Sequence, residues 1–254
     1  MKTNYFLQNI NPHTTQQKIV YNNQLTQNIE NALKQKNILI SNLIFSEKKE
    51  TNTINLDLFY RTNKLKYYRN KIKKIKSTSS LVKKDSNLIL NLFQKNNLNV
   101  KIRNLNLLIR KKRLIRIFKK YKFFSTKLFN KRFNLFGDFI KVLTLFKQKK
   151  ASPWLLCYLI STTFKSLQKK KHGLFTSFVN QIFKDIILEK NSAVEGIKFI
   201  IAGRLKGKPR ASFTKITVGK ISLNSQNKDI QKTQLHCYTI YGCFGLKLWI
   251  NYKK

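Results

Sequence analysis

Residues 196–207 read GIKFIIAGRLKG and residues 239–250 read TIYGCFGLKLWI, and these two segments decide the fold of the C-terminal part of the chain. Each combines β-branched and aromatic residues, which favour strands, with glycines, which favour tight turns. Around them, β-like runs cover 197–202, 212–223, 234–241 and 243–252. The pattern predicts four strands of an antiparallel sheet.

Two amphipathic helices are predicted ahead of these strands. Ser152 and Pro153 suit the N-cap and the first turn of a helix over 154–168. Gly173 is then expected to break the chain before a second helix, for which apolar residues at helical spacing cover 174–189. The C-terminal part therefore reads α-α-β-β-β-β, an α+β arrangement.

A second α+β unit is expected in the N-terminal part of the chain. Residues 1–23 are polar and unpatterned, which indicates an extended arm. Residues 24–105 then show helix, strand, strand, helix and strand patterns in turn. These patterns cover 24–36, 38–45, 53–60, 81–95 and 98–105.

Residues 106–150 differ from both flanking parts in charge. They hold fifteen lysines and arginines and a single acid, Asp138, with phenylalanines and tyrosines interleaved. We interpret them as a basic helical insertion of two or three helices, in which most of the aromatic rings form small cores. The basic side chains can pair with phosphates, and the candidates for RNA contact are Arg110, Lys111, Lys112 and Arg113.

The overall charge restricts the class of partner. The chain has 52 Lys+Arg against 10 Asp+Glu, a formal net charge of +42 over 254 residues. Repulsion among so many cations opposes a compact isolated chain, whereas a polyanionic partner removes the repulsion. The cations run almost the whole length, which favours RNA over a membrane surface, since membrane binding usually concentrates them on one amphipathic helix. Hydrophobic residues make up 42%, enough for folded cores.

The same composition argues against an enzyme, a metal site or a membrane span. The ten acids form no paired motif, and neither a nucleophile–base arrangement nor a phosphate-binding glycine loop is found. Cys157, Cys237 and Cys243 have no metal-ligand spacing, so neither a metal nor a cofactor is expected. No apolar run approaches the ~18 residues that span a bilayer.

The residue usage also indicates where the gene lies. The chain has 27 Asn but only 5 Ala and 8 Gly, as expected of an A+T-rich genome such as that of an organelle or a parasite. The N-terminus is neither a secretory signal nor an Arg-rich transit peptide. If the protein works in an organelle, we therefore expect it to be encoded there; the alternative is that a presequence is missing from this sequence.

The two glycine-containing segments carry a family resemblance. Residues 196–207 resemble the GIK-x4-GRL-x-G block of the small-subunit ribosomal protein three family, and residues 239–250 resemble its T-x-YG-x-x-G-x-K-x-WI terminus. Ala151-Ser152-Pro153 and Lys184-Asp185-Ile186 resemble the mitochondrial branch of that family. The resemblance covers residues 151–254 and implies a C-terminal domain of this family.

The resemblance also implies a place for the protein. The family lies in the head of the small ribosomal subunit, where it binds small-subunit rRNA, touches neighbouring ribosomal proteins and lines the channel through which mRNA enters. Bacterial members carry a Phe-Arg-Arg run on the second helix of this domain that is tied to mRNA unwinding. Here the nearest match is Phe175-Thr176-Ser177, without either arginine, so unwinding is not predicted.

The N-terminal unit resembles the family's KH domain, with one departure. A KH domain clamps nucleotide backbone with a GxxG loop, but the corresponding segment 61–66 has no glycine, and the first glycine of the chain is Gly137. We expect residues 24–105 to be a degenerate KH-like scaffold. Its phosphate contacts would come from lysine side chains instead, namely Lys64, Lys66 and Lys71.

Two further basic segments of the C-terminal domain are candidates for RNA contact. Lys169, Lys170 and Lys171 follow the first predicted helix. A second group lies beside Gly203 and Gly207, which allow the backbone to approach phosphate closely, and consists of Arg204, Lys206, Lys208 and Arg210. Trp249 is expected to anchor the core of the final strand.

Taken together, the sequence predicts a structural constituent of the small ribosomal subunit in a mitochondrion. Its expected partners are small-subunit rRNA, mRNA at the channel and neighbouring head proteins. The alternative is a non-ribosomal organellar RNA-binding or processing factor, which would also be basic and KH-like. A plastid is the alternative compartment.

Overall fold

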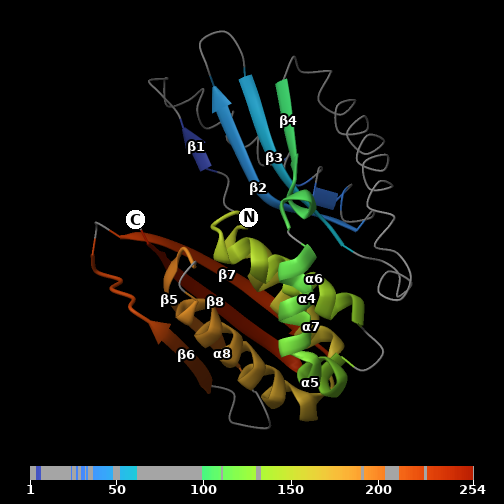
Figure 1. Cartoon of the computed structure of the whole chain (residues 1–254). Helices are drawn as coiled ribbons and strands as arrows, with labels where there is room; N and C mark the ends of the chain where they lie inside the picture. The colour runs from blue at the N-terminus through green and yellow to red at the C-terminus, as the bar shows by residue number, and fades with distance from the viewer. Residues whose placement is uncertain are drawn as a thin grey trace. The chain divides into compact units, whose positions relative to one another are not determined.

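The computed structural model describes most of the C-terminal part of the chain and selected segments of the N-terminal part. The described residues are 4–6, 24, 27, 30, 31, 33, 37–47, 52–61, 99–109, 111–129, 133–189, 192–203, 212–225 and 228–253. The chain divides into two compact units, residues 1–108 and residues 109–254. Figure 1 shows the elements of each.

The first unit contains a four-stranded mixed sheet. Its strands, in the spatial order β1-β2-β3-β4, are β1 (Asn4–Phe6), β2 (Ile38–Glu47), β3 (Asn52–Tyr60) and β4 (Asn99–Asn104). The β2–β3 pair is antiparallel, whereas β1–β2 and β3–β4 are parallel. A parallel pair requires a long crossover connection, and residues 61–98 provide it between β3 and β4.

One face of this sheet packs into an apolar core. Residues 24, 27, 30, 31 and 33 are helical, as expected within 24–36, and Leu33 joins the strand residues of the core. Leu56 and Leu58 are fully buried there. The predicted helix over 81–95 lies outside the described residues.

A charged pair links β3 to β4. Arg103 lies directly opposite Asp57 in the parallel register. Its guanidinium donates two hydrogen bonds to the carboxylate, of 2.7 Å from Nε and 2.6 Å from the terminal nitrogen. This two-pronged geometry is the strong form of such a pair. The strand ends in a short 3-10 helix, η2 (Leu105–Leu108).

The second unit begins with the helices predicted within residues 106–150. They are α4 (Lys111–Lys120), α5 (Lys122–Phe124), the π-helical turn η3 (Ser125–Phe129) and α6 (Phe133–Lys147). Tyr121, Phe129 and Phe136 are buried, which confirms that aromatic rings of this basic segment form a core. These helices belong to the same compact unit as the C-terminal helices and strands.

The two predicted amphipathic helices are present. They are α7 (Pro153–Ser166) and α8 (His172–Leu188), with a 3-10 turn, η4 (Lys169–Lys171), between them. Ser152 is the N-cap of α7, as predicted, and its hydroxyl accepts from the Leu155 N–H at 3.4 Å.

One detail of the connection between these helices was predicted wrongly. Gly173 does not break the chain but lies buried in the first turn of α8. Its carbonyl accepts from the hydroxyls of Thr176 and Ser177. The change of direction occurs earlier, at Leu167, which has an extended backbone.

The C-terminal sheet is antiparallel throughout, as predicted. Its spatial order is β6-β5-β8-β7, with β5 (Val194–Ala202), β6 (Phe213–Gly219), β7 (Asp229–Thr239) and β8 (Gly242–Tyr252). Strand β7 starts five residues before the predicted 234, because residues 229–233, mostly polar, continue the pairing with β8. Helices α7 and α8 lie on one face of this sheet (Figure 1).

Two glycines of the motif segments allow close backbone packing in this sheet. A Cβ at Gly196 would lie 2.3 Å from the Lys220 carbonyl oxygen, closer than any real contact. Gly203 has a φ of +133°, a conformation that side chains rarely adopt, at the end of β5. Backbone geometry thus explains two glycines of this segment, Gly196 and Gly203.

Candidate nucleic-acid interface

Acidic side chains of the described residues are neutralised by neighbouring cations. Six carboxylates lie in ion pairs with a lysine or arginine. The pairs are Asp57–Arg103, Asp138–Lys141, Asp185–Lys120, Glu189–Lys147, Glu195–Lys228 and Asp229–Lys149. Because the chain holds 52 Lys+Arg and only ten acids, its carboxylates are too few to balance most of its cations.

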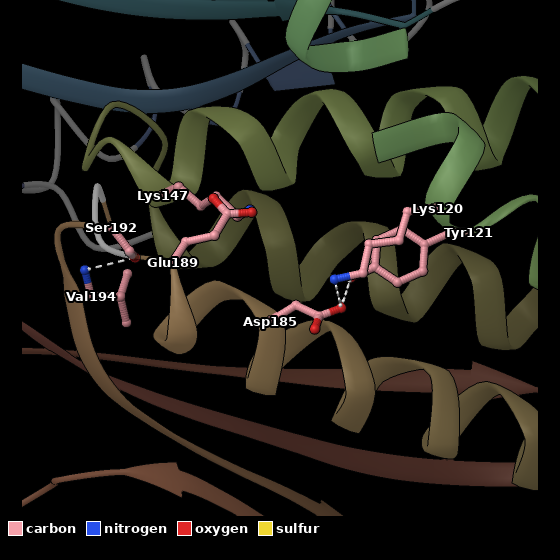
Figure 2. Close-up of polar contacts among 7 residues, drawn as sticks. All are labelled: Lys120, Tyr121, Lys147, Asp185, Glu189, Ser192 and Val194. Atoms are coloured by element: carbon pink, nitrogen blue, oxygen red, sulfur yellow. Dashed lines mark hydrogen bonds and ion pairs between the residues drawn. The ribbon is translucent and has the colours of Figure 1, made fainter. Parts of the chain in front are cut away.

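The polar contacts of Asp185 fix the basic helix α4 to α8. Lys120 at the end of α4 lies 2.9 Å from the Asp185 carboxylate, and the hydroxyl of Tyr121 donates to the same oxygen (Figure 2). Burial and this hydrogen bond raise the pKa of Tyr121, so the phenol stays a donor. The cations of α4 are therefore held in a fixed position on the C-terminal domain.

A second set of contacts connects α6 to the start of β5. The Lys147 ammonium lies 2.5 Å from Glu189 at the end of α8, and the Lys147 carbonyl accepts from the Ala193 N–H at 2.9 Å. The Val194 N–H donates to the Ser192 hydroxyl at 3.2 Å, as Figure 2 shows. These bonds connect α6 to the end of α8 and to the segment that enters β5.

The predicted lysine run lies at the beginning of α8. Lys169 and Lys170 are exposed, and Lys171 is half-buried, in the 3-10 turn η4. The N-terminus of a helix carries a partial positive charge and favours anions. Three cations at that end add to this charge instead of cancelling it, so the turn is a strongly positive point that suits a phosphate.

The basic segment of residues 110–113 is described only in part. Lys111, Lys112 and Arg113 belong to α4 by their backbone, but their side chains and Arg110 lie outside the described part of the chain. Further along the same helix, Arg116 and Lys119 are exposed.

Seven other predicted contact residues also lie outside the described residues. The ends of the predicted basic turn are nevertheless held together, because the Gly203 N–H donates to the Ser212 carbonyl at 2.9 Å and the Ser212 hydroxyl donates to the Gly203 carbonyl at 3.2 Å. The residues in question are Lys64, Lys66, Lys71, Arg204, Lys206, Lys208 and Arg210.

The structure shows a group of cations that was not predicted from the sequence. Lys198, Lys215, Lys232 and Lys247 share the sheet face opposite the helices, and the prediction that Trp249 anchors the core is wrong. Trp249 lies half-buried among these lysines, with the ammonium groups of Lys198 and Lys232 at 5.3 and 5.7 Å from its ring centroid. The signal was present in the alternation of β8, where Lys247 and Trp249 lie two residues apart and thus on one face.

No group of three or more potential metal ligands occurs among the described residues. Within the same residues, no helix has both the length and the apolar character needed to span a bilayer.

Comparisons with known proteins match the C-terminal part. Residues 170–250 match the family described as ribosomal protein S3, C-terminal domain. The mitochondrial small ribosomal subunit protein uS3m of Oenothera berteroana is 38% identical over 86 residues, which is 34% of this chain and 16% of the relative. The protein uS3 of the Ziziphus jujuba witches'-broom phytoplasma is 36% identical over 77 residues, 30% of this chain and 31% of the relative.

A further relative is the protein uS3c of Mesostigma viride, 38% identical over 61 residues, 24% of this chain and 29% of the relative. The chain thus covers less than a third of the length of each of these relatives. The matched region contains α8 and the whole sheet β5–β8 except for its last residues. Over residues 170–250 the chain is thus similar to the C-terminal domain of the ribosomal protein S3 family.

Proposed function

We propose that this protein is a structural constituent of a small ribosomal subunit in an organelle, and that it binds small-subunit rRNA through its basic surfaces. The observation that carries the proposal is the match of residues 170–250 to the S3 C-terminal domain, in a chain with a net charge of +42. The matched relatives are small ribosomal subunit proteins by name. Neutralising rRNA phosphates would offset the self-repulsion of the chain and release counterions.

The location within the ribosome is part of the same proposal. A place in the head, beside the channel through which mRNA enters, is supported by the positive turn Lys169–Lys171, which lies at the start of the matched region. There the lysines would contact mRNA or rRNA, and exposed surfaces nearby would contact other head proteins. The proposed compartment is the mitochondrial matrix, supported by the resemblance to uS3m and by the A+T-biased composition.

The N-terminal unit is proposed to be a KH-like scaffold over residues 24–105, preceded by an arm over 1–23. Support comes from the chain order of helical residues, two antiparallel strands and a third, parallel strand. The proposed division then continues with the basic helices of 106–150 and the C-terminal domain of 151–254. In this scheme the N-terminal lysines contact rRNA phosphates as point charges in place of a GxxG loop.

Sedimentation of the tagged protein from organelle lysates tests the proposal. The protein should travel with the small ribosomal subunit and remain there after a high-salt wash, because a folded domain seated among rRNA helices is held by packing as well as by charge. A protein that washes off at moderate salt, as a loosely bound cation does, would contradict a structural role. Recovery in other RNA-containing fractions would favour a processing factor instead.

A further inference from the structure

The sheet face opposite α7 and α8, here called the open face, carries a regular array of cations. Strand register places Lys198 of β5, Trp249 of β8 and Lys232 of β7 in one row across the sheet. The adjacent row contains Lys215 of β6 and Lys247 of β8, with Ile200 of β5 between them. Lysines two strands apart are separated by about 10 Å at the backbone.

Burial confirms that these side chains point away from the helices. Leu246, Leu248 and Ile250 of β8 are fully buried on the helical side. Since successive side chains of a strand alternate between faces, Lys247 and Trp249 lie on the other side. Lys215 and Lys232 are exposed.

The described carboxylates of this sheet do not balance these lysines. Glu195 pairs with Lys228 at 3.0 Å and also accepts from the Asn251 amide at 2.8 Å. Asp229 pairs with Lys149. The two acids are thus already occupied, and the open face has an excess of positive charge among the described residues.

Exposed aromatic rings lie at one end of the same face. Phe213 of β6 is 66% exposed and Tyr238 of β7 is 69% exposed. Phe213 is paired across the sheet with Ala202 of β5, and Tyr238 with Cys243 of β8, which puts both rings on the side of Lys215 and Trp249. Large exposed rings cost solvation, so an external contact would stabilise them.

We propose that the open face is a binding surface for an unpaired segment of RNA. Its phosphates would contact Lys198, Lys215, Lys232 and Lys247, and its bases would stack on Phe213 and Tyr238. Proteins that bind single-stranded nucleic acids combine cations along the phosphate backbone with aromatic rings on which any base can stack. An open four-stranded sheet with helices behind it is an arrangement that other RNA-binding domains use in the same way. The proposal rests on the proposed function, because it assumes that the protein works among rRNA.

A pair of matched variants of the full chain tests the proposal. Lys215→Gln with Lys232→Gln removes two cations from the open face, and Lys165→Gln with Lys184→Gln removes two exposed cations from α7 and α8 on the other side. The probe is an unpaired RNA oligonucleotide of roughly ten nucleotides, titrated at several salt concentrations. Thermal unfolding of each variant checks that the fold is retained.

The open-face variant should lose two phosphate contacts. Each contact contributes about 0.7 to the slope of log affinity against log salt, so the slope should fall by about 1.4 and the affinity by roughly 25-fold at ~0.1 M salt. The helix-face variant should keep the wild-type slope. Equal slopes for the two variants would overturn the proposal while leaving RNA binding elsewhere on the chain intact. Failure of the wild-type chain to bind RNA at all would overturn the proposed function itself.

The aromatic rings provide a second, independent measurement. Phe213→Leu with Tyr238→Leu should weaken binding of the unpaired oligonucleotide by at least about fivefold per ring, and leave binding of a duplex of equal charge unchanged. Equal losses for both RNAs would contradict base stacking. Unchanged RNA binding, together with loss of a neighbouring ribosomal protein from assembled subunits, would assign the face to a protein partner and overturn the proposal.

Discussion

At the scale of single residues, Gly196 shows how backbone packing dictates the motif at the start of β5. The Lys220 carbonyl lies where a side chain would begin, and because it belongs to the backbone it cannot rotate away. Asn251 donates to the same carbonyl at 3.1 Å, so this oxygen is held from both sides. The site therefore has room only for glycine.

Gly196→Ala should destabilise the protein by about 1–3 kcal/mol, the usual cost of forcing an extra methyl group into a packed site. The matched control is Gly245→Ala, since a Cβ there would meet Ala202 at 3.8 Å, an ordinary contact. Denaturant unfolding in a high-salt buffer measures both. A loss at Gly245 as large as that at Gly196 would contradict the close-approach explanation.

His172 gives a pH dependence at the same scale. Its ring is buried against Phe164, Tyr241 and Phe244, and Nε2 lies 3.2 Å from the Leu167 carbonyl oxygen. Burial lowers the pKa of His172, because the charged ring would lose its hydration. The folded state thus takes up the proton at lower pH than the unfolded chain does.

The contribution of His172 to stability should consequently be constant above about pH 7 and should fall as the pH drops below about 6.5, where the unfolded chain gains a proton that the folded protein does not. His172→Gln should reduce this slope between about pH 5 and 7. Melting temperatures across that range measure the effect, and identical slopes in the wild-type and His172→Gln proteins would show that His172 does not titrate as described.

At the scale of elements, Phe178 of α8 joins the basic helices to the C-terminal domain. Its ring contacts those of Tyr121 and Phe124 beside α5 and those of Phe136 and Phe139 on α6, with centroid distances of 5.0 to 6.1 Å. These rings lie far from Phe178 in the sequence, so its packing connects α5 and α6 to α8.

Phe178→Ala should cost about 3–5 kcal/mol and should loosen α4–α6 together with α8. The control is Phe123→Ala, since that ring is 57% exposed and contacts chiefly Phe124 and the Lys127 ammonium. It should cost less than about 1 kcal/mol. Hydrogen exchange reports which helices open. Unchanged protection of α4–α6 in Phe178→Ala would mean that these helices are stable without the domain.

The elements also show what a sequence can predict and what it cannot. Local signals located α7 through its Ser152 cap and the C-terminal strands through their glycines, because caps and turns depend on neighbouring residues. The side of the sheet on which Trp249 lies was predicted wrongly. Its large apolar ring stands between Leu248 and Ile250, which suggests a core residue. Only the alternation of side chains along β8 places Trp249 on the opposite face from these two neighbours. Helices α4–α6 belong to the same unit as the C-terminal domain through contacts such as the one between Tyr121 and Asp185. These two residues are far apart in the sequence, so no local pattern of residues predicts their contact.

At the scale of the whole molecule, the excess of 42 positive charges should govern how the isolated protein behaves. Six of the described acids form internal ion pairs with a lysine or arginine. The chain has far more cations than acids, so many cations can bind a polyanion. The purified chain should aggregate or retain nucleic acid below ~0.3 M salt and become soluble and RNA-free above it. Light scattering and the ratio of absorbance at nucleic-acid and protein wavelengths follow this change. A soluble, RNA-free monomer in dilute buffer would contradict the electrostatic account.

If the protein is a built-in part of a small ribosomal subunit, each subunit should contain one copy of it. Quantitative mass spectrometry of gradient-purified, salt-washed organellar small subunits measures this number, with undisputed ribosomal proteins as internal standards. We expect the same copy number for this chain as for those standards, one for each particle. A clearly sub-stoichiometric amount, or recovery of the protein only in fractions without ribosomal subunits, would contradict it.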